Sequence, residues 1–184
     1  MTRPPILLRA FAALVLLFLQ LPVIVVAISA FTETSYLIFP PQGFTFRWFG
    51  AVLTDPDWLS AIGFSLMLAL QATLASLVVG TAAAYAISRR MIPGSDAIAS
   101  FLMAPLVFPA VVIGVALLQF YALVGWCGNF VALVAAHVVL TSPYVVRACL
   151  SSLAGVKLDL EEAASTLGAS GLTTFRLVTL PLLK

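Results

Sequence analysis

The sequence predicts an all-α, polytopic membrane protein built as a helical bundle of about four spans. Of its 184 residues, 62% are hydrophobic and only 9% are charged, whereas soluble domains carry about 25% charged residues. Its uncharged runs are long enough to cross a bilayer, because about 20 apolar residues rising about 1.5 Å each span about 30 Å of hydrocarbon. The net charge is +2 and the basic residues are scattered, which argues against nucleic acid as a partner.

The uncharged runs define the spans. Residues 97–146 carry no formal charge and are too many for one helix, and their middle, Gly125–Asn129, is typical of a turn. This stretch therefore predicts two helices joined by a hairpin. The four predicted spans cover residues 10–31, 59–88, 98–124 and 130–150.

The first span has an alternative interpretation as a cleaved signal peptide. Arg3 and Arg9 precede it, and Ala27–Ala30 resembles a cleavage site. Its apolar core is longer than the usual 7–15 residues of a signal peptide, and the rest of the chain is itself membrane-embedded. A retained span is therefore favoured.

The placement of lysine and arginine predicts the orientation. With the N-terminus in the cytoplasm, eight of the nine basic residues fall on or near the cytoplasmic side, where positive charge accumulates in membrane proteins. These eight are Arg3, Arg9, Arg89, Arg90, Arg147, Lys157, Arg176 and Lys184. Arg47 alone falls outside.

The predicted external segment, residues 33–57, contains Pro40-Pro41, which breaks a helix. Aromatic residues follow, namely Phe44, Phe46, Trp48, Phe49 and Trp58. They favour an aromatic belt at the membrane interface, and a contact surface for an external partner is compatible with it.

The sequence predicts no catalytic residue, metal ligand or cofactor site. Neither of the two lysines has the glycine spacing of a phosphate-binding loop, and no nucleophile–histidine set lies on one membrane face. Cys127 and Cys149 are separated by a membrane-length apolar run, which makes a disulfide improbable. His137 lies mid-span, and a neutral, hydrogen-bonded role between helices is favoured over a substrate contact.

The C-terminal segment, residues 158–182, differs from the rest by its charge, hydroxyl groups and glycine. Asp159 and Glu162 have the spacing of a capping box, and Gly168 stands where a left-handed C-cap would end a short helix. The first helix would carry Leu160, Ala163, Ala164 and Leu167 on one face, with Glu161, Ser165 and Thr166 opposite. Ser170 would cap a second helix with Leu172, Phe175 and Thr179 on one face, stopped or kinked by Pro181.

This segment resembles the EAA motif of permease subunits of ABC importers. Glu162-Ala163-Ala164 is followed after three residues by Gly168, and after nine more by Val178-Thr179-Leu180-Pro181. The family pattern has isoleucine where Val178 stands. The likeness covers residues 58–184 and is closest to the spermidine/putrescine branch, although ferric-iron and thiamine importers share much of it. It also includes Gly80–Ala86, Arg89-Arg90, Pro143–Arg147 and Gly155.

The resemblance implies the transmembrane domain of a type I ABC importer in a bacterial inner membrane. Such permeases have a six-helix core, so about four of six spans are expected here and the chain would be C-terminally incomplete, as a fragment or a truncated product. The implied division is an N-terminal span with its external loop, 1–57, and a partial transmembrane domain, 58–184, ending in the coupling loop.

The resemblance also implies the partners and the site. The expected partners are cytoplasmic ABC ATPase subunits, a second permease subunit in a homo- or heterodimer, an external solute-binding protein and the lipid bilayer. The chain itself would not be an enzyme, because ATP hydrolysis would occur on a partner. The implied ATPase-coupling residues are Asp159, Leu160, Glu162, Ala163, Ala164, Leu167, Gly168, Leu180 and Pro181.

Two other functions stay open at this point. A secondary transporter or channel subunit usually places charged residues inside its spans, whereas the four predicted spans contain no Asp or Glu. A truncated remnant that inserts but transports nothing is the other alternative. The transported solute, polyamine-type by resemblance, is not fixed by the residues themselves.

Overall fold

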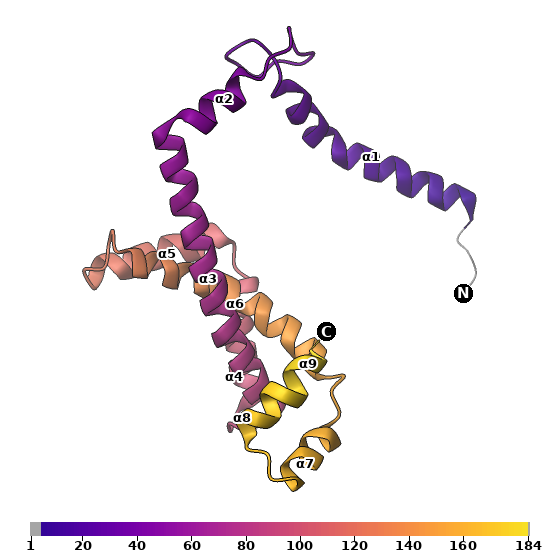
Figure 1. Cartoon of the computed structure of the whole chain (residues 1–184), viewed down its shortest axis with the longest axis vertical. Helices are drawn as coiled ribbons and strands as arrows, with labels where there is room; N and C mark the ends of the chain where they lie inside the picture. Colours follow the sequence, from indigo (N-terminus) through magenta and orange to yellow (C-terminus); the bar gives the residue numbers. More distant parts are fainter. Residues whose placement is uncertain (1–4, 184) are drawn as a thin grey trace. The chain divides into compact units, whose positions relative to one another are not determined.

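The computed structural model describes residues 5–183, and these are helices and turns without a strand (Figure 1). They confirm the all-α prediction. Arg3 and Lys184, two of the basic residues counted for orientation, lie outside the described residues. The chain divides into two compact units, Met1–Phe64 and Ser65–Lys184.

Three helices of the described residues are long and apolar enough to cross a membrane. They are α1 (Ile6–Ser29), α3 (Pro56–Ser88) and α6 (Phe130–Leu153). A bent pair of shorter helices supplies a fourth crossing if the pair counts as one span. These elements match the four predicted spans in place and order.

The first unit shows the predicted break at Pro40-Pro41, because residues 30–46 form no helix before the short α2 (Arg47–Thr54). Aromatic rings gather in this loop, and Phe31 stacks on Phe44 with ring centroids 5.2 Å apart. The Trp48 indole donates a hydrogen bond of 2.9 Å to the carbonyl of Thr32. The aromatic residues of this loop therefore pack against one another, and the aromatic belt at the membrane interface stays a prediction.

Helix α3 begins with a proline, and the turn that follows its last residue, Ser88, contains an arginine in an unusual conformation. Pro56 occupies the first turn, where its missing N–H costs nothing. At the other end, the N–H of Met91 bonds to the carbonyl of Ala86 and that of Arg90 to Ile87. Arg90 adopts φ +49°, so it fills the position at which helix ends usually have glycine.

The predicted third span is sharply bent. Helix α4 (Ser95–Met103) continues through the 3-10 turn η1 (Ala104–Leu106) and meets α5 (Ala110–Leu123) at 102°. Pro105 and Pro109 lie at this break. Each lacks the N–H that a continuous helix needs, and this interrupts the helix here. The two prolines therefore account for the break in this span.

The predicted hairpin between α5 and α6 is also confirmed. Gly125 and Gly128 both have positive φ, 72° and 75°, a conformation that costs glycine little. Asn129 then caps α6, since its side-chain oxygen accepts a hydrogen bond of 2.8 Å from the N–H of Val131.

Helices α3 and α6 pack through small side chains. In α3 the buried Ala72, Ser76, Gly80 and Ala84 recur every four residues and so share one face. The Ser76 hydroxyl lies 2.6 Å from that of Thr141 in α6. A β-carbon added to Gly80 would come within 2.8 Å of Val145. Close approach of small residues is the usual way in which membrane helices associate, and the sequence prediction missed this stripe.

The C-terminal segment forms the predicted helix–turn–helix. It consists of α7 (Leu158–Thr166), α8 (Gly171–Thr174), the π-helical turn η2 (Phe175–Thr179) and α9 (Leu180–Leu182). Pro181 does not stop the second helix, which runs on to Leu182. A proline ring crowds the carbonyl four residues earlier, here Leu177, and the wider π turn that contains Leu177 accommodates it.

Candidate functional site

The start of α7 differs from the prediction. The helix begins at Leu158 with Lys157 as its N-cap, and no side chain caps it. The predicted capping box of Asp159 and Glu162 is therefore wrong, because Asp159 already lies inside the first turn. Its carboxylate and that of Glu161 still stabilise α7, because both negative charges lie near the positive, N-terminal end of the helix dipole.

The end of α7 is as predicted. Gly168 has φ +86°. Its N–H bonds to the carbonyl of Ser165 at 2.9 Å, and the N–H of Ala169 bonds to Ala164 at 3.1 Å. This pair of bonds is the Schellman motif, which satisfies the free carbonyls at a helix end and needs a left-handed residue at Gly168.

Ser170 caps α8 as predicted, since its hydroxyl accepts a hydrogen bond of 3.3 Å from the N–H of Thr173. The predicted face of the second helix is only partly right. Thr179 is buried and Phe175 half-buried, but Leu172 points to the outside. Thr174 takes the buried position instead, because the π turn shifts the helical register between Thr174 and Thr179.

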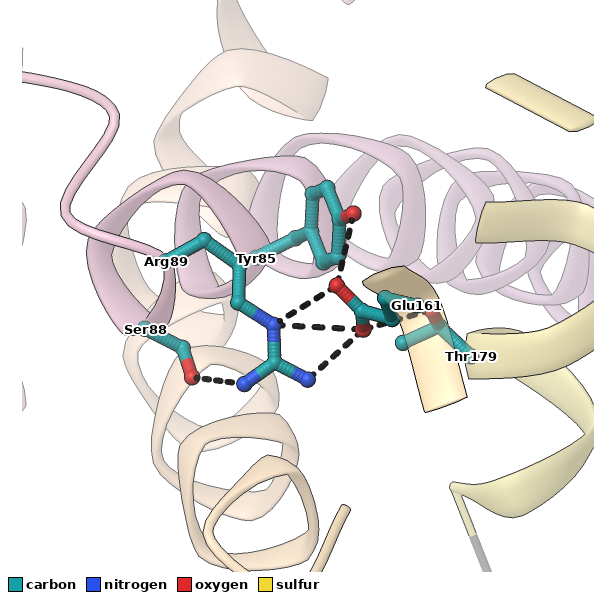
Figure 2. Close-up of polar contacts among 5 residues, drawn as sticks. All are labelled: Tyr85, Ser88, Arg89, Glu161 and Thr179. Carbon is teal, nitrogen blue, oxygen red and sulfur yellow. Dashed lines mark hydrogen bonds and ion pairs between the residues drawn. The ribbon is translucent and has the colours of Figure 1, made fainter. Parts of the chain in front are cut away.

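The centre of the site is the carboxylate of Glu161, which accepts hydrogen bonds from three other residues (Figure 2). Arg89 Nη2 donates to Oε1 at 2.7 Å, and Arg89 Nε lies 3.1 Å from Oε2. Thr179 Oγ1 donates to Oε1 at 2.7 Å, and the Tyr85 hydroxyl donates to Oε2 at 3.3 Å. We call these four residues, Tyr85, Arg89, Glu161 and Thr179, the Glu161 cluster.

The Glu161 cluster is largely shielded from solvent. The side chains of Arg89 and Glu161 are only 9% and 11% exposed. Burial opposes the charged form of Glu161, but the hydrogen bonds from Arg89 and Thr179 outweigh it and hold the pKa of this carboxyl below its ordinary value. The two-point contact of a planar guanidinium with a carboxylate is both strong and directional.

Ring contacts surround the cluster. The ring of Tyr85 meets that of Phe175 edge-on, with centroids 4.9 Å apart, and the Arg89 guanidinium lies 5.9 Å from the Tyr85 ring centre. Tyr85 therefore links α3 to both halves of the C-terminal segment, through its hydroxyl to α7 and through its ring to η2. Edge-to-face aromatic pairs add to the energy gained from burial alone.

The opposite face of α7 is open. Leu160 and Leu167 are 47% and 89% exposed, and Ala163 is exposed between them. Glu162 is exposed too, and its carboxylate makes no hydrogen bond or ion pair within residues 5–183. The predicted apolar face is thus present except for Ala164, which turns toward the Glu161 side and is half-buried. Leu180 and Pro181 are exposed on α9.

A cleft of about 280 Å³ lies between α7, α8 and the end of α3. Both Glu161 and Glu162 line it, and the side chain of Glu161 is only 11% exposed whereas Glu162 is exposed. It is lined by Tyr85, Arg89, Met91, Leu158, Glu161, Glu162, Ser165, Ala169, Gly171 and Thr174. The two consecutive glutamates of α7 therefore have different surroundings, one held by the protein and the other free to meet a partner.

Sequence reasoning missed Tyr85, Arg89 and Glu161 as site residues and named Thr179 only for its helical face. The sequence offered only a weak indication of this cluster, namely the consecutive Glu161 and Glu162 and an arginine, Arg89, at the end of a predicted span. Nothing in the sequence pairs positions 89 and 161, which are 72 residues apart.

His137 and the two cysteines, which the sequence analysis considered individually, lie outside the Glu161 cluster. His137 Nδ1 donates a 2.8 Å hydrogen bond to the carbonyl of Leu133, one turn earlier in α6. This bond is within one helix, whereas the prediction placed it between helices. Cys127 and Cys149 are both free, and Cys127 is exposed in the hairpin. No group of three or more metal-ligating side chains occurs in the part of the chain that the structure describes.

Spanning helices joined to a polar helix–turn–helix define a polytopic, all-α membrane protein. A sequence profile of the family described as "Binding-protein-dependent transport system inner membrane component" matches residues 76–184. The chain belongs to this family of inner-membrane transport components. The match includes the small-residue stripe from Ser76 onward, Arg89 and the whole helix–turn–helix.

Curated relatives agree with this assignment. The chain is 36% identical over 173 residues to the putrescine transport system permease protein PotI of Escherichia coli, covering 90% of this chain and 61% of PotI. It is 31% identical to the spermidine/putrescine transport system permease protein PotC of Haemophilus influenzae, covering 95% of this chain and 67% of PotC. The molybdate/tungstate transport system permease protein WtpB of Pyrococcus furiosus is 32% identical, over 79% of this chain and 58% of WtpB. The chain thus spans about three fifths of the length of PotI.

Proposed function

We propose that this chain is a membrane-spanning permease subunit of an ATP-driven importer and that α7 is its docking helix for a cytoplasmic ATPase. The observation that carries the proposal is the division of α7 into two faces. Glu161 fastens one side of α7 to the spanning helix α3, whereas Leu160 and Leu167 on its apolar face, and the unpaired Glu162 on the side away from that face, are exposed to a partner. A helix of this kind can both bind a partner and pass on its movement.

The docking face suits an apolar groove with a basic rim. Leu160, Ala163 and Leu167 lie on one side of α7 at helical spacing, and alanine between two leucines permits close approach of a partner. Glu162 adds a carboxylate that a partner arginine can hold by two hydrogen bonds. Amphipathic helices bind grooves in this way, with anchors three and four residues apart.

The ion pair between Arg89 and Glu161 also constrains the topology. Because the end of α3 and α7 touch, they lie on the same side of the membrane, so the chain between them crosses an even number of times. Helix α6 supplies one crossing, and the bent pair α4–α5 must supply the other. We infer four crossings, with the N-terminus, the end of α3 and α7 in the cytoplasm, where Arg89, Arg90 and Lys157 satisfy the positive-inside rule.

The partners and the solute follow from the family. We propose a second permease subunit, a cytoplasmic ATPase and an external solute-binding protein, with a polyamine as the transported solute. Transport of putrescine by PotI and of spermidine and putrescine by PotC supports the polyamine, and transport of molybdate or tungstate by WtpB marks these anions as the alternative to be tested.

The proposal is tested by co-expressing the chain with its ATPase, second permease and solute-binding protein. Capture of the ATPase on a tagged chain and ATP-dependent uptake of labelled putrescine into proteoliposomes are expected. Uptake of molybdate in place of putrescine would overturn the solute assignment alone. Absence of ATPase capture and of any uptake would overturn the permease assignment.

A further inference from the structure

We propose that Glu161 is a positioning residue whose ion pair with Arg89 transmits movement from the docking helix α7 to the spanning helix α3. This inference rests on the proposed function and assigns separate tasks to two consecutive glutamates. Glu162 faces the partner, whereas Glu161 couples the docked helix to the membrane domain.

Helix α7 has little else to hold it in place. None of its nine residues is buried, so it gains little from the removal of apolar surface from water. Its two ends are short connections, at residues 154–157 and 167–170. The carboxylate of Glu161 is therefore the main side-chain attachment that fixes the direction of α7 relative to α3 and η2.

The attachment joins three elements at one group. Tyr85 comes from the last turn of α3 and Arg89 directly follows that helix, whereas Glu161 comes from α7 and Thr179 from η2 (Figure 2). Thr179 is completely buried and is brought to Glu161 by the π turn. Any displacement of α7 by a partner must either carry α3 and η2 with it or break several hydrogen bonds at once.

The chemistry of the cluster requires a carboxylate. An ionised carboxylate only accepts hydrogen bonds, and here it receives them from a guanidinium and two hydroxyls. In Glu161→Gln, one acceptor oxygen becomes an NH₂ group that faces donors, and Arg89 loses its counter-charge. This substitution changes the side chain's volume very little, so its effect reports on charge and hydrogen bonding.

The matched control is Asp96→Asn. Asp96 lies close to Arg90, but at 3.9 Å and with both side chains 80–90% exposed, a kind of pair that contributes little. The experiment uses the chain assembled with its ATPase, second permease and solute-binding protein in proteoliposomes. Three quantities are measured: ATPase captured, ATP hydrolysed, and solute taken up per ATP.

For Glu161→Gln we expect ATPase capture close to wild type, continued hydrolysis, and a fall of about fivefold or more in solute taken up per ATP, the lower end of typical coupling strengths. Asp96→Asn should match wild type in all three quantities. The double exchange Glu161→Arg with Arg89→Glu should recover part of the lost coupling, because the two hydroxyls can also accept hydrogen bonds from a guanidinium.

Unchanged uptake per ATP in Glu161→Gln would overturn the proposal, and so would a double exchange no better coupled than its single changes. If Glu161→Gln does not accumulate in the membrane, Thr179→Val and Arg89→Lys replace it, and normal coupling in both would overturn the proposal. Failure of the wild-type chain to capture the ATPase would instead count against the proposed function, so the two failures are distinguishable.

Discussion

Arg89 and Glu161 are separated by 72 positions in the chain, yet their side chains meet at 2.7 Å in a largely buried ion pair. The pair joins the end of a spanning helix to a helix that has no buried residue of its own. Removing one partner of such a pair leaves an uncompensated charge in poorly hydrated surroundings, which is costly. The position of α7 therefore depends on the presence and the charge of both Arg89 and Glu161.

The first prediction concerns pH. The pKa of Glu161 lies below its ordinary value of 4.5, so its stabilising contribution is complete above about pH 5 and is lost as the pH falls through the lowered pKa. A spin label on Leu167→Cys, in a chain without Cys127 and Cys149, should have constant mobility from pH 7 to about 5 and become more mobile in stronger acid. Combined with Glu161→Gln, the label should be mobile throughout. An acid-induced increase of the same size in that variant would contradict the assignment.

The second prediction concerns Glu162. Glu162→Gln should weaken capture of the ATPase, because it removes an exposed, unpaired charge from the proposed docking helix α7. Insertion and abundance should stay nearly unchanged, since Glu162 makes no ion pair or side-chain hydrogen bond within residues 5–183. Co-purification at several salt concentrations measures this, because screening by salt should reduce the difference from wild type. Asp96→Asn, which removes an exposed charge elsewhere, should bind the ATPase normally.

The third prediction concerns Gly168. Its φ of +86° costs an ordinary L-residue about 1–2 kcal/mol, and β-branched residues tolerate the left-handed region least. Gly168→Val should therefore reduce both ATPase capture and uptake, whereas Gly168→Asn should be milder because asparagine is sometimes found at this position. A steric clash does not cause this loss, since a β-carbon added at Gly168 would meet nothing within 4 Å. Equal effects of both variants would contradict this backbone explanation.

The fourth prediction concerns the packing of α3 on α6. Gly80→Ala should lower the stability of the detergent-solubilised protein by about 1–3 kcal/mol, because the added β-carbon would meet Val145 at 2.8 Å. Gly63→Ala in the same helix is the control, since its β-carbon would meet nothing within 4 Å. Thermal unfolding measures the difference. In a double-mutant cycle, Gly80→Ala should cost less in a Val145→Gly background, where both atoms at 2.8 Å are gone, than in the native chain. Equal costs in the two backgrounds would contradict the steric cause.

The fifth prediction concerns topology. In the native chain, the exposed Cys127 of the hairpin should react with an impermeant thiol reagent added to intact cells. In a background without Cys127 and Cys149, Asp96→Cys and Lys157→Cys should react only after the cells are opened, because the proposed arrangement places both positions with Arg89 on the cytoplasmic side. Labelling of Lys157→Cys in intact cells would overturn the four-crossing arrangement.

The sequence by itself determined the features that local chemistry controls. The long apolar runs determined the spans, and the prolines at 105 and 109 determined the break in the third. The hairpin at Gly125–Gly128, the left-handed Gly168 and the cap at Ser170 all followed from residue types whose backbone preferences act within a few positions. The resemblance to the family motif then singled out residues 158–182 as the segment for which we propose docking.

Tertiary structure decided the rest, because the decisive contacts join residues far apart in the chain. The spacing of Asp159 and Glu162 favoured a capping box, but α7 begins one residue before Asp159 and leaves both side chains exposed. Which of two adjacent glutamates faces inward depends on the direction in which α7 meets α3. That direction is set by Arg89, Tyr85 and Thr179, whose donors converge on Glu161 only after the helices have packed.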